Sequence, residues 1–125
     1  DLEALVGEYT HTENQVYRLE SFETTSGNKI ESNAVVTLTI EGEEITKQAK
    51  GDGPVDAAFK AIEKICGKQF LLQTYRIHAV TEGEDAMGMV DVMMNIDGRV
   101  YKGRGVSTDI IESSIRACLD ALNRV

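Results

Sequence analysis

The sequence predicts an α+β fold made of two βββα units that are related by a pseudo-twofold axis. Strand, loop, strand, tight turn, strand, glycine-containing segment and helix follow one another twice within the 125 residues. Equivalent positions keep a nearly constant separation, since Ile40 and Ile96 lie 56 residues apart and Ile62 and Ile115 lie 53 apart. One three-stranded sheet with one helix hardly buries its own apolar face, so we expect the two halves to pack as one compact domain.

The first half begins with three predicted strands. Residues 16–22 are rich in aromatic and branched side chains, which favours a strand, and the polar segment 24–33 is predicted to be a loop. Residues 34–40 alternate apolar and polar side chains, which indicates a strand with one buried face. A turn at 41–43 then leads to a returning strand at 45–49.

A helix is predicted from Pro54 to about Cys66. Pro54 suits the first helical turn, where its missing N–H costs nothing, and Gly67 is a typical C-cap. The apolar residues of this segment recur at helical spacing. They are Val55, Ala58, Phe59, Ile62, Ile65 and Cys66.

The second half repeats this order. Residues 70–80 and 89–96 are predicted strands, with a loop at 81–85 between them. Asp97-Gly98 is a two-residue hairpin signal, because both central positions of a type I′ turn need positive φ. The chain is expected to return as a strand at 99–104.

A second glycine loop is predicted at Gly105–Asp109, and it leads into the last helix. Ser107 or Thr108 is the expected N-cap of that helix. The apolar face of the helix is formed by residues at helical spacing. They are Ile111, Ile115, Cys118, Leu119 and Leu122.

Composition restricts the function. The formal net charge is −8 and the pI is about 4.7, which disfavours binding to nucleic acid or to a membrane surface. No apolar run approaches the ~20 residues that span a bilayer, and the first residues do not form a secretion signal, so we expect a cytoplasmic protein. Residues 1–15 are expected to be a linker end or a short helix from a preceding domain. The domain itself is expected at 16–125, with its halves at about 16–67 and 68–125.

Catalytic and metal chemistry find little support in the residues. Cys66 and Cys118 lie among apolar neighbours without a CxxC partner, so we interpret both as structural. His11 and His78 belong to no metal-binding spacing, and no nucleophile motif occurs. We therefore expect no catalytic residue, no metal and no cofactor in this chain.

The first glycine loop, Gly51-Asp52-Gly53-Pro54, is the candidate ligand site. Glycines allow close approach of a ligand to the backbone, and the unpaired N–H groups of a helix start attract anions. Asp52 disfavours phosphate, so a small carboxylate is the expected ligand. The second loop could bring the other helix start close by, so that Asp52, Asp56 or Asp109 faces an ammonium group. The alternative is that each loop is only a tight turn that begins a helix.

These segments resemble a known family. Residues 51–58 (GDGPVDAA), residues 105–114 (GVSTDIIESS) and the ending Ala121-Leu122-Asn123 resemble the carboxy-terminal regulatory domain of 2-isopropylmalate synthase. Citramalate synthase carries a closely similar domain. The resemblance covers Val16–Val125 and implies two βββα units, a homodimer, and a branched-chain amino acid effector, leucine or isoleucine, that inhibits a separate catalytic barrel.

The resemblance also implies the residues of an effector site. They are Gly51, Asp52, Gly53, Pro54, Val55, Asp56, Tyr75, Ala79 and Ile110. Family members often carry asparagine at the position of Asp52; an ionised aspartate accepts hydrogen bonds but does not donate them.

The catalytic barrel, which needs about 250 residues, is absent, so this chain is not expected to be an enzyme by itself. The expected parent is an acyl-CoA-dependent acyltransferase. We expect feedback inhibition in leucine biosynthesis with leucine as the effector. The alternatives are an isoleucine-sensing domain of citramalate synthase and a purely structural dimerisation module. The sequence leaves open whether the ligand lies within one chain or at the dimer contact.

Overall fold

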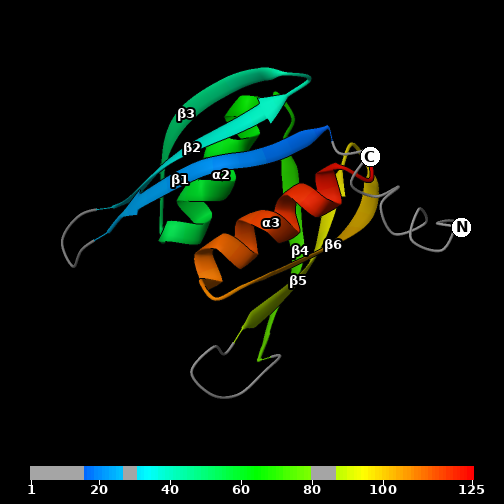
Figure 1. The fold of residues 1–125 in the computed structure, drawn as a ribbon. Helices are drawn as coiled ribbons and strands as arrows, with labels where there is room; N and C mark the ends of the chain where they lie inside the picture. Colours follow the sequence, from blue (N-terminus) through cyan, green and yellow to red (C-terminus); the bar gives the residue numbers. More distant parts are fainter. Residues whose placement is uncertain (1–15, 27–30, 80–86) are drawn as a thin grey trace, which may run out of the picture.

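The computed structural model describes residues 16–26, 31–79 and 87–125, and it confirms the predicted α+β fold with two βββα units (Figure 1). In chain order the elements are β1 (Tyr17–Thr25), β2 (Ser32–Ile40), β3 (Glu43–Gly51), α2 (Pro54–Cys66), β4 (Phe70–Ala79), β5 (Gly88–Ile96), β6 (Arg99–Ser107) and α3 (Ile110–Leu122). The interpretation of residues 1–15, the loop at 81–85 and His11 lie outside the described residues.

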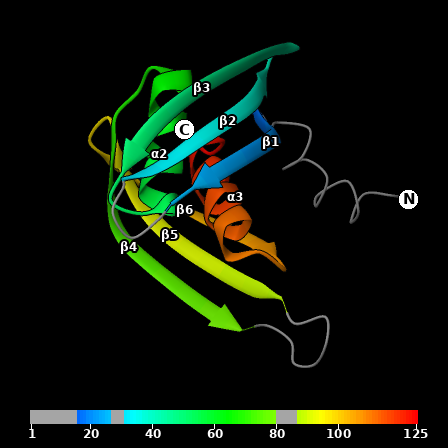
Figure 2. The same ribbon diagram turned by 90° about the vertical axis from the view of Figure 1, so that its left-hand side faces the viewer.

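Each half forms its own antiparallel sheet, with the strand orders β1-β2-β3 and β4-β5-β6. The two helices lie between the two sheets (Figures 1 and 2). Helix α2 covers β2 and β3, whereas α3 covers β5 and β6, and the two helices contact each other. Strand β4 is therefore an edge strand that neither helix covers well.

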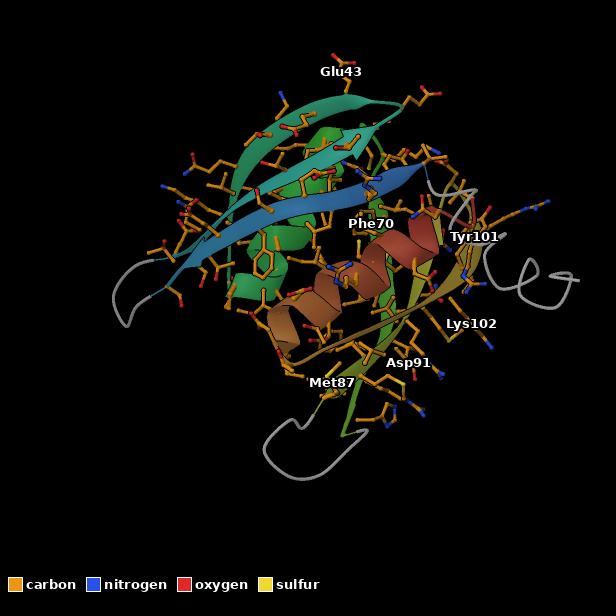
Figure 3. The ribbon with its side chains drawn as sticks, in the orientation of Figure 1. Glu43, Phe70, Met87, Asp91, Tyr101 and Lys102 are labelled. Carbon is orange, nitrogen blue, oxygen red and sulfur yellow. The ribbon has the colours of Figure 1, made fainter. Side chains whose placement is uncertain are left out.

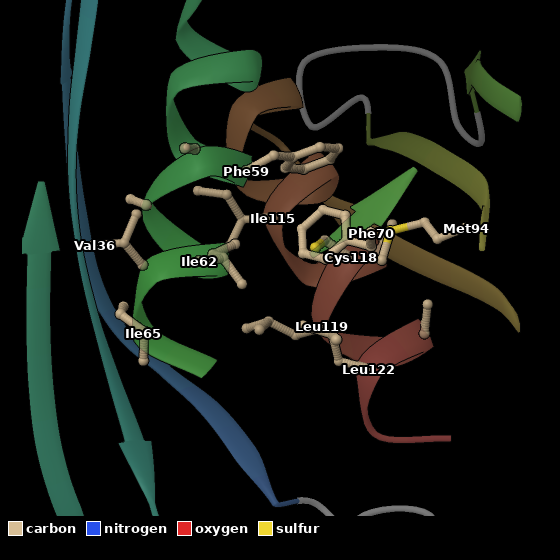
Figure 4. Close-up of a cluster of buried hydrophobic side chains, with 14 of the residues drawn as sticks. Val36, Phe59, Ile62, Ile65, Phe70, Met94, Ile115, Cys118, Leu119 and Leu122 are labelled. Carbon is tan, nitrogen blue, oxygen red and sulfur yellow. The ribbon is translucent and has the colours of Figure 1, made fainter. Parts of the chain in front are cut away.

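One apolar core joins the two halves. Val36 from the first sheet, Ile62 from α2 and Ile115 from α3 are fully buried in the same cluster (Figure 4). Met94 and Ile96 from the second sheet complete it with no exposed surface. The expectation that the halves bury their apolar faces against each other is confirmed.

The predicted turns and the first helix are confirmed in detail. Both hairpins have positive φ at their central residues, 53° and 85° at Glu41 and Gly42, and 55° and 87° at Asp97 and Gly98. Helix α2 begins at Pro54 and ends at Cys66, as predicted. Gly67 adopts the left-handed conformation, with a φ of 71°, and its N–H donates to the Glu63 carbonyl at 2.9 Å.

The predicted loop at Gly105–Asp109 is wrong in its first three residues, because β6 continues to Ser107. Gly105 is buried in this strand, where a Cβ would collide with the Ser113 carbonyl and the Ala117 amide of α3. This glycine therefore lets helix and strand approach closely and does not form a ligand loop.

The predicted N-cap of the last helix is also wrong. Asp109 caps α3, since its Oδ1 accepts from the Ile111 N–H at 2.9 Å. The Ser107 hydroxyl instead accepts from the Asp109 N–H at 3.2 Å. The strands of the first hairpin are longer than predicted too, because pairing of Asn33 with Lys50 extends β2 and β3 into polar sequence.

The two cysteines have the structural character that was predicted. Both thiols are free, and Cys118 is fully buried in the core. Burial raises the pKa of the Cys118 thiol well above its ordinary value and also raises the pKa of Cys66. A raised pKa keeps a thiol protonated at neutral pH, and only the thiolate is a nucleophile.

Candidate functional site

The beginning of α2 presents backbone amides without a side-chain cap. Gly53 is the N-cap, its carbonyl accepts from the Ala57 N–H at 2.9 Å, and no side chain caps the helix. Pro54 has no N–H, so the first helical amides are those of Val55 and Asp56. The helix dipole adds partial positive charge at this end, which favours an anionic group.

The Asp56 carboxylate fastens the loop that precedes the helix. Its Oδ2 accepts from the Asp52 N–H at 3.0 Å and lies 3.2 Å from the Lys60 Nζ. The hydrogen bond that Lys60 donates to Asp56 raises the pKa of Lys60, so the lysine remains charged. A Cβ on Gly51 would collide with this carboxylate, which explains the glycine at that position by close packing.

Gly53 is different, because the fold itself does not require a glycine there. Its φ of −153° is extended backbone, open to other residues. Apart from Gly53 itself and its two chain neighbours, no heavy atom lies within 4 Å of the place where a Cβ would be. The absence of a side chain leaves open space directly in front of the helix start.

A groove of about 320 Å³ runs beside this helix start, between α2 and β4. Its lining comes from these two elements only: Val55, Asp56, Phe59, Lys60, Glu63, Phe70, Leu72 and Tyr75. The floor is apolar, with Phe59 and Phe70 in edge-to-face contact at a ring distance of 6.2 Å. The rim carries the charged groups of Asp56, Lys60 and Glu63.

Tyr75 connects this groove with α3, the helix of its own half. Its hydroxyl lies 2.6 Å from the Ser114 Oγ on α3, and Ser114 is fully buried. The Ser114 hydroxyl donates to the Ile110 carbonyl at 2.8 Å. Tyr75 thus lies at the junction between the α2 groove and the first turns of α3.

Ala79 and Ile110 lie around one glycine at the far side of this junction. Ala79 pairs with Gly88 across β4 and β5. A Cβ on Gly88 would collide with the Cδ1 of Ile110, and the Ser113 hydroxyl donates to the Gly88 carbonyl at 3.0 Å. These contacts place Ile110 directly against β5, the strand whose Gly88 pairs with Ala79.

The structure therefore brings together part of the predicted site. Val55, Asp56 and Tyr75 line one groove, whereas Ile110 is not part of its lining. The lining of this groove includes no residue of α3, so a ligand space shared by both helix starts stays a prediction; Asp109 uses its carboxylate to cap α3.

Sequence reasoning missed several residues of the groove and its junction. Phe59 was interpreted as core because of its helical spacing, and it is indeed buried although it also lines the groove. Leu72 and Ser114 carried no signal, because their contacts depend on how distant segments pack.

Two further features bear on the kind of site. Within residues 16–26, 31–79 and 87–125, no group of three His, Cys, Asp or Glu side chains could hold a metal ion. None of the described helices is long and apolar enough to cross a membrane.

Comparison with known proteins identifies the family. Residues 1–125 match the family described as "LeuA allosteric (dimerisation) domain". The chain is 48% identical to the 2-isopropylmalate synthase of Ruminiclostridium cellulolyticum over 99% of its length. It is 46% identical to that of Carboxydothermus hydrogenoformans over its whole length, and 46% identical to that of Rhodopirellula baltica over 87%.

The chain spans only about a quarter of the length of these relatives, 24%, 25% and 21% respectively. The match covers the whole chain and agrees with the two βββα units and with the resemblance carried by the glycine and helix motifs. This chain belongs to the family of LeuA allosteric (dimerisation) domains.

Proposed function

We propose that this chain is the regulatory domain of a 2-isopropylmalate synthase and binds a branched-chain amino acid, leucine in the first place, for feedback inhibition of leucine biosynthesis. The names of the relatives and the description of the family support this assignment. Acyl transfer belongs to the catalytic barrel of the parent enzyme, which is a partner of this domain. The domain works as a homodimer in the cytoplasm.

The observation that carries the effector site is Gly53. A glycine that the backbone and the packing do not require stands at a helix start without a side-chain cap. The amides of Val55 and Asp56 at this place suit the carboxylate of an amino acid. A side chain at position 53 would occupy the space that this carboxylate needs.

The remaining parts of the ligand have matching surroundings. The ammonium group faces Asp52 or Asp56, of which Asp52 is exposed to solvent. The branched side chain lies on apolar surface near Val55 and Tyr75, and Ala79 and Ile110 limit its length beyond the junction with α3. Gly51 and Pro54 set the path of the loop.

Inhibition requires more than binding. The effector must bind one conformation of the parent enzyme more tightly than another, since equal affinity for both would shift nothing. Tyr75 lines the groove opposite α2 of the first half, and its hydroxyl contacts Ser114 on α3 of its own half. It is therefore the residue through which occupancy of the groove reaches α3.

The comparisons with known proteins also bear on the two alternatives, an isoleucine sensor and a purely structural dimerisation module. The relatives reported above are named 2-isopropylmalate synthase, which favours leucine over the isoleucine effector of a citramalate synthase. A purely structural dimerisation module is supported by the second part of the family description. Ligand binding separates that module from a sensor.

Titration calorimetry of the chain with leucine, isoleucine and valine tests the proposal. Leucine is expected to bind about fourfold more tightly than valine, because it buries one more methylene, worth ~0.8 kcal/mol. A clear preference for isoleucine would indicate the isoleucine-sensing domain of a citramalate synthase. No heat with any of the three at millimolar concentration would remove the sensor function.

A substitution locates the site. Gly53→Val is expected to abolish leucine binding and to leave the circular dichroism spectrum and thermal midpoint unchanged, because the space around position 53 is empty. Thr108→Val is the matched control, since it places the same side chain just before the N-cap of α3. Unchanged leucine affinity in Gly53→Val would show that the loop only begins a helix.

A further inference from the structure

The second sheet exposes large apolar side chains that the first sheet does not. In the described part of the chain the exposed large apolar residues are Val16, Leu71, Leu72, Ile77, Val100, Val106 and Val125. Five of these seven lie on β4 and β6, and none lies within β1, β2 or β3. Because the two sheets are repeats of one unit, this difference marks one side of the molecule for contact.

Three of the four edge strands carry charges that discourage another chain from pairing with them. The charged residues are Arg18, Glu20 and Glu23 on β1, Glu43, Glu44, Lys47 and Lys50 on β3, and Arg99, Lys102 and Arg104 on β6. Glu43 points away from the domain, and Lys102 lies with Asp91 on the outer side of the second sheet (Figure 3). The free edge of β6 also has a hydrogen-bond partner within the domain, because the Arg104 N–H donates to Asp120 Oδ2 at 2.9 Å.

Strand β4 is the exception. Its ten residues include one charged side chain, Arg76, and one histidine, His78. It lies at the free edge of the second sheet in the side view (Figure 2). An edge strand with few charges and exposed apolar residues is a template for association with another chain.

The apolar residues of β4 are exposed on both of its sides. Leu72 and Ile77 pair with the buried Met94 and Val90, so they lie on the helix side of the sheet, yet they are 43% and 53% exposed. Leu71 lies on the outer side and is 71% exposed. We call Leu71, Leu72 and Ile77 together the β4 surface.

We infer that a second copy of this chain packs against the β4 surface, so that β4 lies at the centre of the homodimer. This inference rests on the proposed homodimer, which the family description supports, and it does not depend on the identity of the effector. A twofold contact uses the same surface on both copies, so the surface must be complementary to itself.

Charge also favours this face. Two copies with a formal net charge of −8 each repel one another, and the repulsion is smallest where no carboxylate faces the partner. Strand β4 carries no Asp or Glu. The strand also carries Tyr75 and Ala79 of the proposed effector site, so the dimer contact lies close to that site.

Sedimentation velocity of the chain over a range of concentrations tests the inference. Ile77→Asp and Leu71→Asp are each expected to raise the dimer dissociation constant at least 100-fold, because the twofold axis places two unpaired carboxylates in one apolar contact. Val125→Asp is the matched control, since Val125 is 51% exposed and lies outside both sheets. It is expected to leave the dissociation constant within threefold.

Other outcomes overturn the inference. A dimer that survives both β4 substitutions, or that is lost only in Val125→Asp, would place the contact elsewhere. A wild-type chain that stays monomeric at high concentration would refute the homodimer itself, whereas the leucine titration would still decide the effector proposal.

Hydrogen exchange gives an independent measurement on the unmodified chain. Amides between Leu71 and Ile77 are expected to exchange more slowly at concentrations where the dimer forms, and those of β3 are expected not to change. Equal protection of β4 at all concentrations, while the dimer forms, would contradict the inference even if a substituted chain failed to fold.

Discussion

The side chain of Asn123 binds the backbone of Tyr17 in both directions. Its Oδ1 accepts from the Tyr17 N–H at 2.8 Å, and its Nδ2 donates to the Tyr17 carbonyl at 3.0 Å. The same Oδ1 accepts from the Val16 N–H at 2.8 Å. One amide at the end of α3 therefore holds the start of β1, over a separation of 106 residues.

Asn123→Ala removes all three hydrogen bonds and is expected to lower the free energy of unfolding by about 1–3 kcal/mol. Urea denaturation with an unchanged m-value measures this loss. Arg124→Ala is the control, because Arg124 is the exposed next residue and its ion pair with Asp120 contributes only a few tenths of a kcal/mol. Equal midpoints for wild type and Asn123→Ala would mean that water replaces the amide without cost.

The bond between Tyr75 and Ser114 is expected to couple β4 energetically to α3 within the second half. Tyr75→Phe and Ser114→Ala each remove one partner of the 2.6 Å contact. A double-mutant cycle of unfolding free energies is expected to give a coupling of ~0.5–1.5 kcal/mol. Strictly additive losses would show that the two hydroxyl groups do not interact in solution.

Gly105→Ala is expected to destabilise the domain by at least ~2 kcal/mol, because the new methyl group meets backbone atoms of α3 that cannot move away alone. Gly53→Ala provides the comparison, since its methyl group enters open space and is expected to leave stability nearly unchanged. Thermal midpoints of the two variants measure the difference. A stable Gly105→Ala protein would mean that α3 shifts outward at little cost.

Stability is expected to fall at acidic pH in a way that depends on Asp91. The Arg104 side chain donates to Asp91 Oδ1 at 2.7 Å, and this hydrogen bond is the main reason why the pKa of Asp91 lies below its ordinary 3.8. A lowered pKa in the folded state means that Asp91 stabilises the fold above pH ~4, and that this contribution disappears as the pH falls through the lowered value.

Asp91→Asn removes that pH-dependent contribution. Urea midpoints of wild type and Asp91→Asn are expected to differ most near neutral pH and to converge toward pH 2. Arg104→Gln should reproduce the same convergence, because it removes the other partner. A constant difference at all pH values would attribute the effect to packing around Asp91 instead.

Much of the fold follows from local sequence signals. Pro54 and Gly67 mark the two ends of α2, since one lacks an N–H that the helix does not need and the other adopts positive φ readily. Asp97-Gly98 determines its hairpin for a similar reason. These signals act within a few residues, which is why the sequence alone suffices to locate them.

Glycine was the main source of error. Gly53 and Gly105 both stand before helices in the sequence, but one lies in open space and the other lies under the backbone of α3. The difference depends on the distance between a strand and a helix, which no local pattern encodes. The bond from Tyr75 to Ser114 spans 39 residues and was invisible for the same reason.

The common core of the two repeats has a consequence for how the chain can be divided. Val36 of the first half is buried in the same cluster as Ile115 of the second. A cut between Gly67 and Lys68 would therefore expose, on each fragment, the apolar surface that the other half covers in the whole chain. Neither fragment should hold its shape in isolation, yet the pair, mixed in equal amounts, should rebuild the whole. Duplication has thus produced two halves that are no longer separable.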